Sequence, residues 1–499
     1  MIRRSLFLCH KETQEAPRIL RAYLCLLCFF VAAVSPLPVR AQARKKPVSR
    51  TTSSPILERN IRAELGFLAS DAMQGRGSGT GYERIAAEYI GSQFQQFGLE
   101  PGGDADASGN KGFVQRVPLE SSRFTEPPAF TVTAGGNTHK WHFGRDFLVS
   151  FLRAPHITGE LQVIEPSGTP AKGAIVVAKL PASADQQQRQ DMIRKARFAE
   201  AVAVVVPESE ANRKTREAGD ARLPTLPGRI PGEGGSDAQF AVISLRQDAL
   251  DTLAGLPAGA RAEFSGAVQQ ADAGSTWNAI GVLRGTDPGG EAIMLSAHLD
   301  HLGVNDALTG DKIFNGADDD ASGSVAVMEM ARVLAAGRKP RRTIYFICFG
   351  SEERGGYGAR YFIAKSPVPL EKIVADFNFE MLGRPDAKVA PGTLWLTGYE
   401  RSTLGPELVR QGAALVADPH PEQNFFQRSD NYTLAVRGVV AHTVSSFGLH
   451  SDYHRPSDDI SKIDFAFMTR SINSLVKPIQ WLANTRFRPA WLPGQAPGR

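Results

Sequence analysis

The sequence is poor in cysteine. Four cysteines occur among 499 residues, and three of them, Cys9, Cys25 and Cys28, lie near the N-terminal end. Only Cys348 remains in the body of the chain, within a run of apolar residues. This scarcity excludes an internal disulfide in the body of the chain, and it means that a zinc site there would have to use nitrogen and oxygen ligands.

The sequence also lacks an excess of charge of one sign. Lys and Arg number 57 against 52 Asp and Glu, and residues 1–43 hold six of the basic and two of the acidic residues. The remaining 51 basic and 50 acidic residues are nearly balanced and form no basic stripe. We therefore expect no nucleic-acid partner.

Long apolar runs are missing as well, apart from one near the beginning. Basic residues including Arg3 and Arg21 precede an apolar stretch at 23–34, and small residues follow it up to Ala43. This order predicts a secretory signal over residues 1–43, with export to the periplasm or the extracellular space and membrane contact only during export. A membrane anchor is the alternative, although the stretch is shorter than the roughly 20 residues that span a bilayer.

Several apolar runs typical of buried strands end in residues that could bind a metal. His298 and Asp300 follow the run 292–296, Glu353 follows 342–350, and Glu380 follows 373–379. In open α/β sheets the carboxyl ends of the strands are where ligands bind. An imidazole two residues before a carboxylate also suits a ligand whose ring is oriented by that carboxylate, which here is Asp300.

Two acidic clusters strengthen this interpretation. Asp318, Asp319 and Asp320 stand side by side before a helical pattern, and they repel one another unless cations lie among them. Glu352 and Glu353 leave a core strand together, so one could bind a metal while the other takes a proton from water. A solvated acidic turn and an exposed polar loop are the alternatives.

His454, in the loop 452–459, completes the candidate set, unless it is simply a surface histidine. A set of two histidines and three carboxylates suits zinc, with one carboxylate bridging two ions. The predicted metal ligands are His298, Asp319, Glu353, Glu380 and His454.

The motifs around these residues resemble those of a known family. They are AHLDHLG, FNGADDDASG, FGSEERGGYGARYF, FNFEMLGR and SDYHRPSDDISKIDF. In order and spacing they are similar to the zinc exopeptidases that include bacterial leucyl aminopeptidases, aminopeptidase Y and glutamate carboxypeptidase II. The resemblance implies two zinc ions: His298 and Glu380 bind one, Glu353 and His454 bind the other, and Asp319 bridges them. It further implies that Glu352 is the general base and that Asp300 orients His298.

The chain departs from the family pattern at two positions. Glu380 stands where members more often carry aspartate. Ser429-Asp430-Asn431 stands where members often read Ser-Asp-His, so an amide replaces the imidazole. The segment 428–432 is expected to shape the substrate pocket. His301 and His450 are expected to lie outside the ligand set, at most in support of it.

The chain length and the order of the patterns predict the domains. We expect an α/β catalytic domain with a three-layer, mostly parallel sheet and helices on both faces. An inserted, mainly β domain that resembles a protease-associated domain is expected to interrupt it. The boundaries are a signal at 1–43, a linker at 44–54, the first part of the catalytic domain at 55–114, the insertion at 115–274, the main catalytic part at 275–487 and a tail at 488–499.

The resemblance thus implies an exported metallo-aminopeptidase that hydrolyses the N-terminal bond of peptides. Alternatives are a glutaminyl-peptide cyclase or a carboxypeptidase of the same fold, and a binding protein without catalytic activity.

Overall fold

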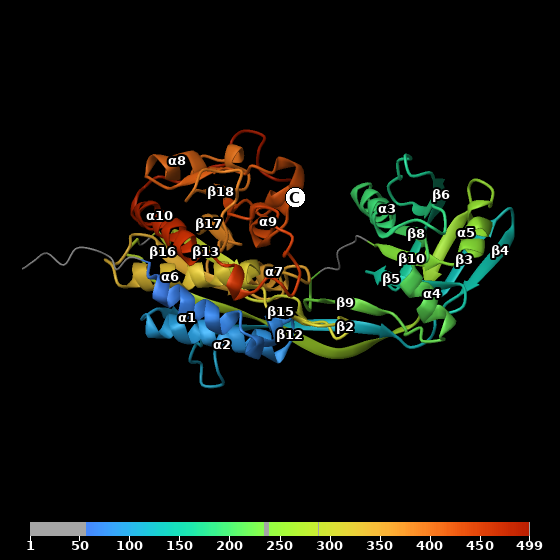
Figure 1. Ribbon diagram of the computed structural model, residues 1–499, viewed down its shortest axis with the longest axis horizontal. Helices are drawn as coiled ribbons and strands as arrows, with labels where there is room; N and C mark the ends of the chain where they lie inside the picture. Colours follow the sequence, from blue (N-terminus) through green and yellow to red (C-terminus); the bar gives the residue numbers. More distant parts are fainter. Residues whose placement is uncertain (1–55, 234–238, 288, 499) are drawn as a thin grey trace, which may run out of the picture. The chain divides into compact units, whose positions relative to one another are not determined.

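The computed structural model describes residues 56–233, 239–287 and 289–498 of the chain (Figure 1). The predicted signal at 1–43 and the linker at 44–54 lie outside these residues, so both stay predictions. Across the described ranges no helix has the length and apolar character that crossing a membrane requires.

A large sheet forms the centre of the catalytic part. In spatial order its strands are β19 (Leu415–Ala417), β18 (Leu394–Leu396), β20 (Ala441–Ser445), β17 (Ile373–Glu380), β13 (Ala292–His298), β16 (Thr343–Phe349), β12 (Val268–Leu283), β2 (Val114–Phe124) and β9 (Thr225–Arg229), and β1 (Glu100–Pro101) pairs with β12. The neighbours β20, β17, β13 and β16 are parallel, whereas β12, β2 and β9 are antiparallel. Four adjacent carboxyl ends therefore meet at one edge of the sheet.

Helices cover both faces of this sheet. Side chains that alternate along β13 pack into two different cores, one on each face. Ile293, Leu295 and Ala297 pack into one core, while Ala292 and Met294 pack into another. The first core includes α1 (Glu58–Leu68), α2 (Gly81–Gln96), α6 (Gly323–Ala335), α8 (Leu404–Arg410) and α10 (Phe465–Asn484). The second includes α7 (Tyr357–Ala364) and α9 (Asp430–Ala435). Burial on both sides explains why these strands are continuous apolar runs, and it confirms the predicted fold class.

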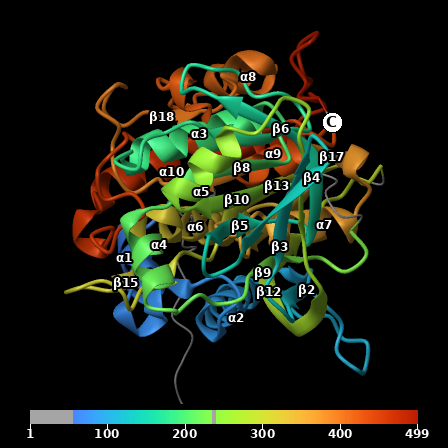
Figure 2. The ribbon, with the colours of Figure 1, turned by 90° about the vertical axis from the view of Figure 1, so that its right-hand side faces the viewer.

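A second sheet lies between β2 and β12 in the sequence. Its order is β4 (Asn137–His142), β3 (Ala129–Ala134), β11 (Arg261–Ser265), β6 (His156–Ile164), β7 (Ile175–Ala178), β8 (Ala203–Pro207), β10 (Ala241–Leu245) and β5 (Phe147–Leu152). Three helices accompany it: α3 (Gln186–Phe198), α4 (Glu210–Glu217) and α5 (Gln247–Ala254). Figure 2 shows α3 and α5 alongside β8 and β10.

The chain leaves the large sheet along β2 and returns along β12. These two strands pair with each other from Val114 opposite Ala279 to Phe124 opposite Val268. An excursion whose outgoing and returning strands are neighbours leaves the host sheet continuous. The second sheet falls within the interval 115–274 predicted for an insertion, while its protease-associated character stays a prediction.

The buried imidazole of His442 in β20 makes the fold sensitive to acid. Its Nδ1 donates to the Thr397 carbonyl at 2.7 Å, and its Nε2 accepts from the Ser402 hydroxyl at 2.7 Å. Burial lowers the pKa of His442 to about 4. As the pH falls, the His442 imidazole is therefore protonated near pH 6.5 in the unfolded chain but only near pH 4 in the folded chain. The free energy of unfolding decreases as the pH falls between these values.

We predict that this histidine contributes about 3 kcal/mol to the loss of unfolding free energy between pH 7.5 and pH 4. Chemical denaturation at several pH values, with the wild type and His442→Gln compared, measures this contribution. The variant should show a correspondingly shallower decline below pH 6.5. Equal slopes for the two proteins would contradict the assignment.

Candidate metal centre

Three neighbouring parallel strands deliver the predicted ligands to one place. β13 ends in His298, β16 is followed by Glu352 and Glu353, and β17 ends in Glu380. Because β13 pairs with both β16 and β17, these strand ends lie next to one another. The turn at Ala317–Ser322 and the loop with His454 bring the remaining predicted ligands to the same edge.

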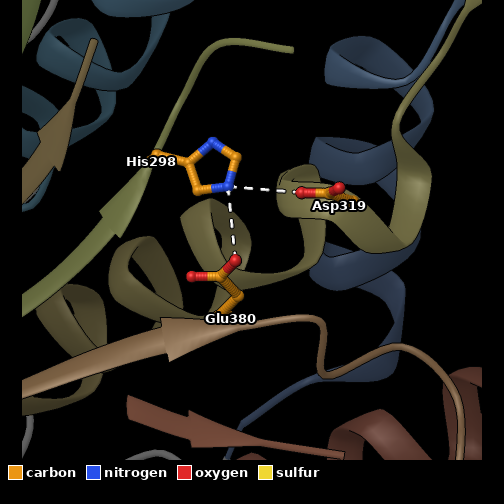
Figure 3. Close-up of side chains that lie close together, drawn as sticks. All are labelled: His298, Asp319 and Glu380. Atoms are coloured by element: carbon orange, nitrogen blue, oxygen red, sulfur yellow. Dashed lines mark ion pairs between the residues drawn. The ribbon is translucent and has the colours of Figure 1, made fainter. Parts of the chain in front are cut away.

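His298, Asp319 and Glu380 form the first half of the cluster (Figure 3). The His298 Nε2 atom lies 3.2 Å from Asp319 Oδ1 and 3.8 Å from Glu380 Oε1. The imidazole and the bridging candidate are almost completely buried, with 1% and 3% of their side-chain surface exposed. These three groups point toward one another, as ligands around a shared ion would.

His454 and Glu353 form the second half of the cluster with the same aspartate. The His454 Nε2 atom lies 3.2 Å from Asp319 Oδ2 and 3.2 Å from Glu353 Oε2. One oxygen of Asp319 thus faces His298 while the other faces His454. This is the arrangement expected of a carboxylate that bridges two ions.

The three consecutive aspartates have different surroundings. Asp318 accepts from His450 Nε2 at 3.0 Å and from the Gly383 amide at 2.7 Å. Asp320 accepts from the amides of His298, Gly323 and Met381 at 3.0 to 3.2 Å. Only Asp319 keeps both carboxylate oxygens directed at the histidines. The two outer carboxylates therefore hold the backbone, and the middle one faces the centre.

Asp458 holds this turn from the opposite side. Its carboxylate accepts from the amides of Asp318 and Asp319 at 3.1 to 3.3 Å, and its carbonyl accepts from the Ala317 amide at 3.1 Å. Burial raises the pKa of Asp458 to about 8, an effect that the neighbouring Asp318 reinforces. Asp458 could not be distinguished from its neighbour Asp459 in the sequence, because its partners are backbone groups far away in the chain.

Asp300 connects the first ligand to the predicted general base. The Nδ1 atom of His298 donates to the main-chain carbonyl of Asp300 at 3.1 Å, while the nearer carboxylate oxygen lies at 3.6 Å. The carboxylate itself accepts from the Glu352 amide at 3.0 Å and from the Ser78 hydroxyl at 2.5 Å. Asp300 thus orients the imidazole mainly through its backbone and fixes the start of the Glu352–Glu353 pair through its side chain.

Glu380 is held by polar groups on its far side. Its Oε2 atom accepts a short hydrogen bond from the Ser429 hydroxyl and a longer one, at 3.3 Å, from Asn378. Asn378 also donates to Ser429 at 2.7 Å and to Thr443 at 3.2 Å. Thr443 in turn donates to Asn431 at 2.9 Å. These contacts restrain the extra methylene of a glutamate, and they give Asn431 a structural role outside the ligand set.

His301 lies closer to the centre than the sequence indicated. Its Nδ1 atom is 2.8 Å from Glu353 Oε1, and with Asp319 and Glu353 it forms a second group whose ligand atoms lie within 4.8 Å of one another. Its ring packs against Gly316, where a Cβ atom would come within 2.6 Å. The second half of the centre thus contains two imidazoles, His301 and His454, on either side of Glu353.

The N-terminal segment holds the site through Glu83, a residue that the sequence did not reveal. The buried Glu83 carboxylate accepts from the Thr276 hydroxyl at 2.6 Å, the Ser351 amide at 2.9 Å and the Gly79 amide at 2.8 Å. Ser351 has a left-handed backbone, with φ at 55°, directly before Glu352. Such a conformation is costly for a serine, and Glu83 helps to maintain it.

Arg76 is the second residue that the sequence did not reveal. Its guanidinium is buried and donates to the carbonyls of Leu299 at 2.9 Å, Leu68 at 2.7 Å, Asn315 at 2.7 Å and Gly316 at 2.9 Å. These carbonyls belong to the end of α1, the turn after β13 and the segment before the three aspartates. One side chain thus joins the backbone on both sides of the centre, and a single arginine in a glycine-rich turn was its only signal.

The chemistry of the cluster fits a pair of divalent cations. Burial lowers the pKa of His298, but the nearby carboxylates of Asp300, Asp319 and Glu380 raise it well above its usual value. Burial likewise lowers the pKa of His454, but the carboxylates of Asp319 and Glu353 outweigh it and raise the pKa to about 10. Among the described residues, His298 Nε2 and Asp319 Oδ2 are buried without a hydrogen-bond partner. Cations bound between these histidines and carboxylates would compensate the same negative charges.

The comparison with protein families gives a match to this part of the chain. Residues 278–477 match the family model described as "Peptidase family M28". This segment is thus similar to the members of peptidase family M28. The match confirms the predicted family resemblance. It covers the strands and loops that carry all five predicted metal ligands.

Known proteins resemble the chain in sequence over short stretches. A probable zinc metalloprotease of Leptosphaeria maculans is 38% identical over 106 residues, which cover 21% of this chain and 24% of that protein. An aminopeptidase of Pseudomonas aeruginosa is 33% identical over 114 residues, which cover 22% of this chain and 19% of that protein. The chain thus spans less than a quarter of the length of these curated relatives.

A solved structure resembles the chain over most of its length. It is an aminopeptidase from Aneurinibacillus sp. strain AM-1, with a TM-score of 0.50 and 19% sequence identity. The alignment covers 89% of this chain and 98% of that one. At this identity the likeness concerns the fold alone.

We predict that Arg76→Leu lowers the free energy of unfolding by at least about 3 kcal/mol, because each buried carbonyl that loses its donor costs about 1–3 kcal/mol. It should also weaken metal binding, since the turn before Asp319 loses an anchor. The exposed Arg59, mutated to leucine, is the matched control and should change stability by less than about 0.5 kcal/mol. Urea denaturation of both variants tests this; equal stabilities would refute it.

Proposed function

We propose that the chain is an exported exopeptidase with two zinc ions, and that it acts as an aminopeptidase on the N-terminal bond of peptides. The observation that carries this proposal is the position of Asp319, whose two oxygens face His298 and His454 from opposite sides at 3.2 Å. His298 and Glu380 would hold one ion, and Glu353 and His454 the other, with Asp319 shared by both.

Zinc ions bound there would supply Lewis-acid polarisation of the scissile carbonyl and a lowered pKa of water. Glu352 is the residue of the pair that this ligand set leaves free. Its backbone is fixed by Asp300, and burial raises the pKa of its carboxyl group well above the usual range, with Glu380 and Asp430 adding to the effect of burial. A carboxylate of raised basicity can accept a proton from the attacking water and deliver it to the leaving amine.

The names of the relatives support the choice of terminus. The Pseudomonas protein and the Aneurinibacillus structure are both described as aminopeptidases. The alternatives, a glutaminyl-peptide cyclase, a carboxypeptidase and a binding protein, differ from an aminopeptidase in the peptides that they would convert. Cleavage of peptides with a free amine only supports the proposal, whereas cleavage of N-blocked peptides, cyclisation of N-terminal glutamine, or zinc binding without any turnover would replace it.

The neighbours Glu352 and Glu353 provide a matched pair of variants. Glu352→Gln should keep wild-type zinc content and lower kcat by about 10²–10⁴-fold, because it removes only the proton acceptor. Glu353→Gln should lose zinc from one of the two positions, because it removes a ligand. Metal analysis and peptide hydrolysis on the same samples separate the two roles. Full activity of Glu352→Gln would show that another group accepts the proton.

Removal of metal tests the two-ion arrangement. Dialysis against a chelator should abolish hydrolysis of a leucyl peptide, and titration with zinc should restore it together with thermal stability, since an ion that binds only the folded state stabilises it. We expect restoration to be complete at about two zinc ions per chain. Full activity at one equivalent, or activity that resists chelation, would contradict the proposal.

A further inference from the structure

A pocket beside Glu380 is lined by aromatic side chains. Trp395, Phe425 and Phe447 are almost completely buried, and Tyr453 joins them next to the predicted metal ligand His454. Consecutive rings lie close together: the ring centroids of Trp395 and Phe425 are 5.4 Å apart, those of Phe425 and Phe447 5.7 Å, and those of Phe447 and Tyr453 5.1 Å. The Tyr453 ring stacks on His454 at 3.9 Å.

These contacts give the pocket rigid apolar walls that lead to the proposed reaction centre. Met381, Ser429, Thr443 and Ser445 complete the lining, together with Glu380 and Arg428. A substrate whose scissile bond lies at the ligand cluster would therefore direct a neighbouring side chain toward this pocket. Aromatic walls favour an apolar chain segment in that side chain.

The two charged residues that line the pocket, Glu380 and Arg428, differ in their polar contacts. The Glu380 carboxylate faces His298 and accepts hydrogen bonds from Ser429 and Asn378, so its charge is directed at the proposed metal. Arg428 is exposed and lies over the Phe425 ring, with its guanidinium carbon 4.9 Å from the ring centroid. Among the described residues, no carboxylate forms an ion pair with Arg428.

We propose that Arg428 makes this pocket select uncharged or acidic side chains in the first residue of the peptide and reject lysine and arginine. This specificity rests on the proposed aminopeptidase function. The physical reason is that an unpaired guanidinium beside the pocket repels a second cation and attracts a carboxylate. Because Arg428 is exposed, water and salt weaken its effect without removing it.

Substrates of matched shape test the proposal with kcat/KM ratios. Relative to wild type, Arg428→Glu should raise the ratio for lysyl over methionyl peptides by about 3- to 10-fold, and Arg428→Gln should lower the ratio for glutamyl over glutaminyl peptides by about 2- to 5-fold. Both changes should shrink at high salt. Arg437→Glu makes the same charge change at an exposed position that does not line the pocket, and it should leave both ratios unchanged.

Binding measurements separate this inference from the proposed function. Calorimetric titration of zinc-loaded Glu352→Gln with lysine amide, methionine amide and glutamate amide reports the pocket preference without turnover. A preference that Arg428→Glu shifts toward lysine supports the pocket assignment even if no peptide is cleaved. Unchanged ratios and affinities in the Arg428 variants overturn the inference while leaving the aminopeptidase proposal intact. A loss of cleavage of N-blocked peptides in Arg428→Glu would instead assign Arg428 to a terminal carboxylate and also overturn it.

Discussion

The position of the Asp319 carboxylate depends on hydrogen bonds that its neighbours make to the backbone. Asp458 fixes the amides of residues 318 and 319, and Asp320 ties together the amides of His298, Gly323 and Met381. Three segments of the chain are thereby held around one carboxylate. Without these contacts, the buried carboxylates would repel one another and draw the turn apart. Both halves of the cluster therefore depend on the same backbone contacts around Asp319.

Backbone strain is concentrated around the cluster. Ser351, Met381 and His454 all have left-handed backbones, with φ between 53° and 55°, and each is a predicted site residue or lies next to one. Residues other than glycine adopt this conformation only when their surroundings compel it. Here Glu83 holds Ser351 and Asp320 holds Met381 through their amides. The surrounding fold therefore bears the cost of aiming these side chains at the cluster.

The strands and the candidate ligands could be predicted from the sequence, because a strand buried on both faces is a continuous apolar run and the ligand candidates stand where such runs end. The choice of Asp319 among three aspartates came from family resemblance, and its physical reason is visible only in the hydrogen bonds of Asp318 and Asp320. Arg76, Glu83 and Asp458 could not be predicted. Arg76 and Asp458 bond to backbone groups, and Glu83 bonds to two amides and two hydroxyls. Many of these partners are more than a hundred residues away, and they leave no pattern in the sequence.

Cys348 is the next-to-last residue of β16, the strand that leads to Glu352 and Glu353. It is fully buried, and burial raises the pKa of its thiol to about 12, so the reactive thiolate does not form at neutral pH. The described part of the chain therefore presents no reactive sulfur to solvent. A cysteine introduced beside the aromatic pocket would be the only one there available to a maleimide dye, so that a fluorophore could report on peptide entry without prior removal of the native thiol.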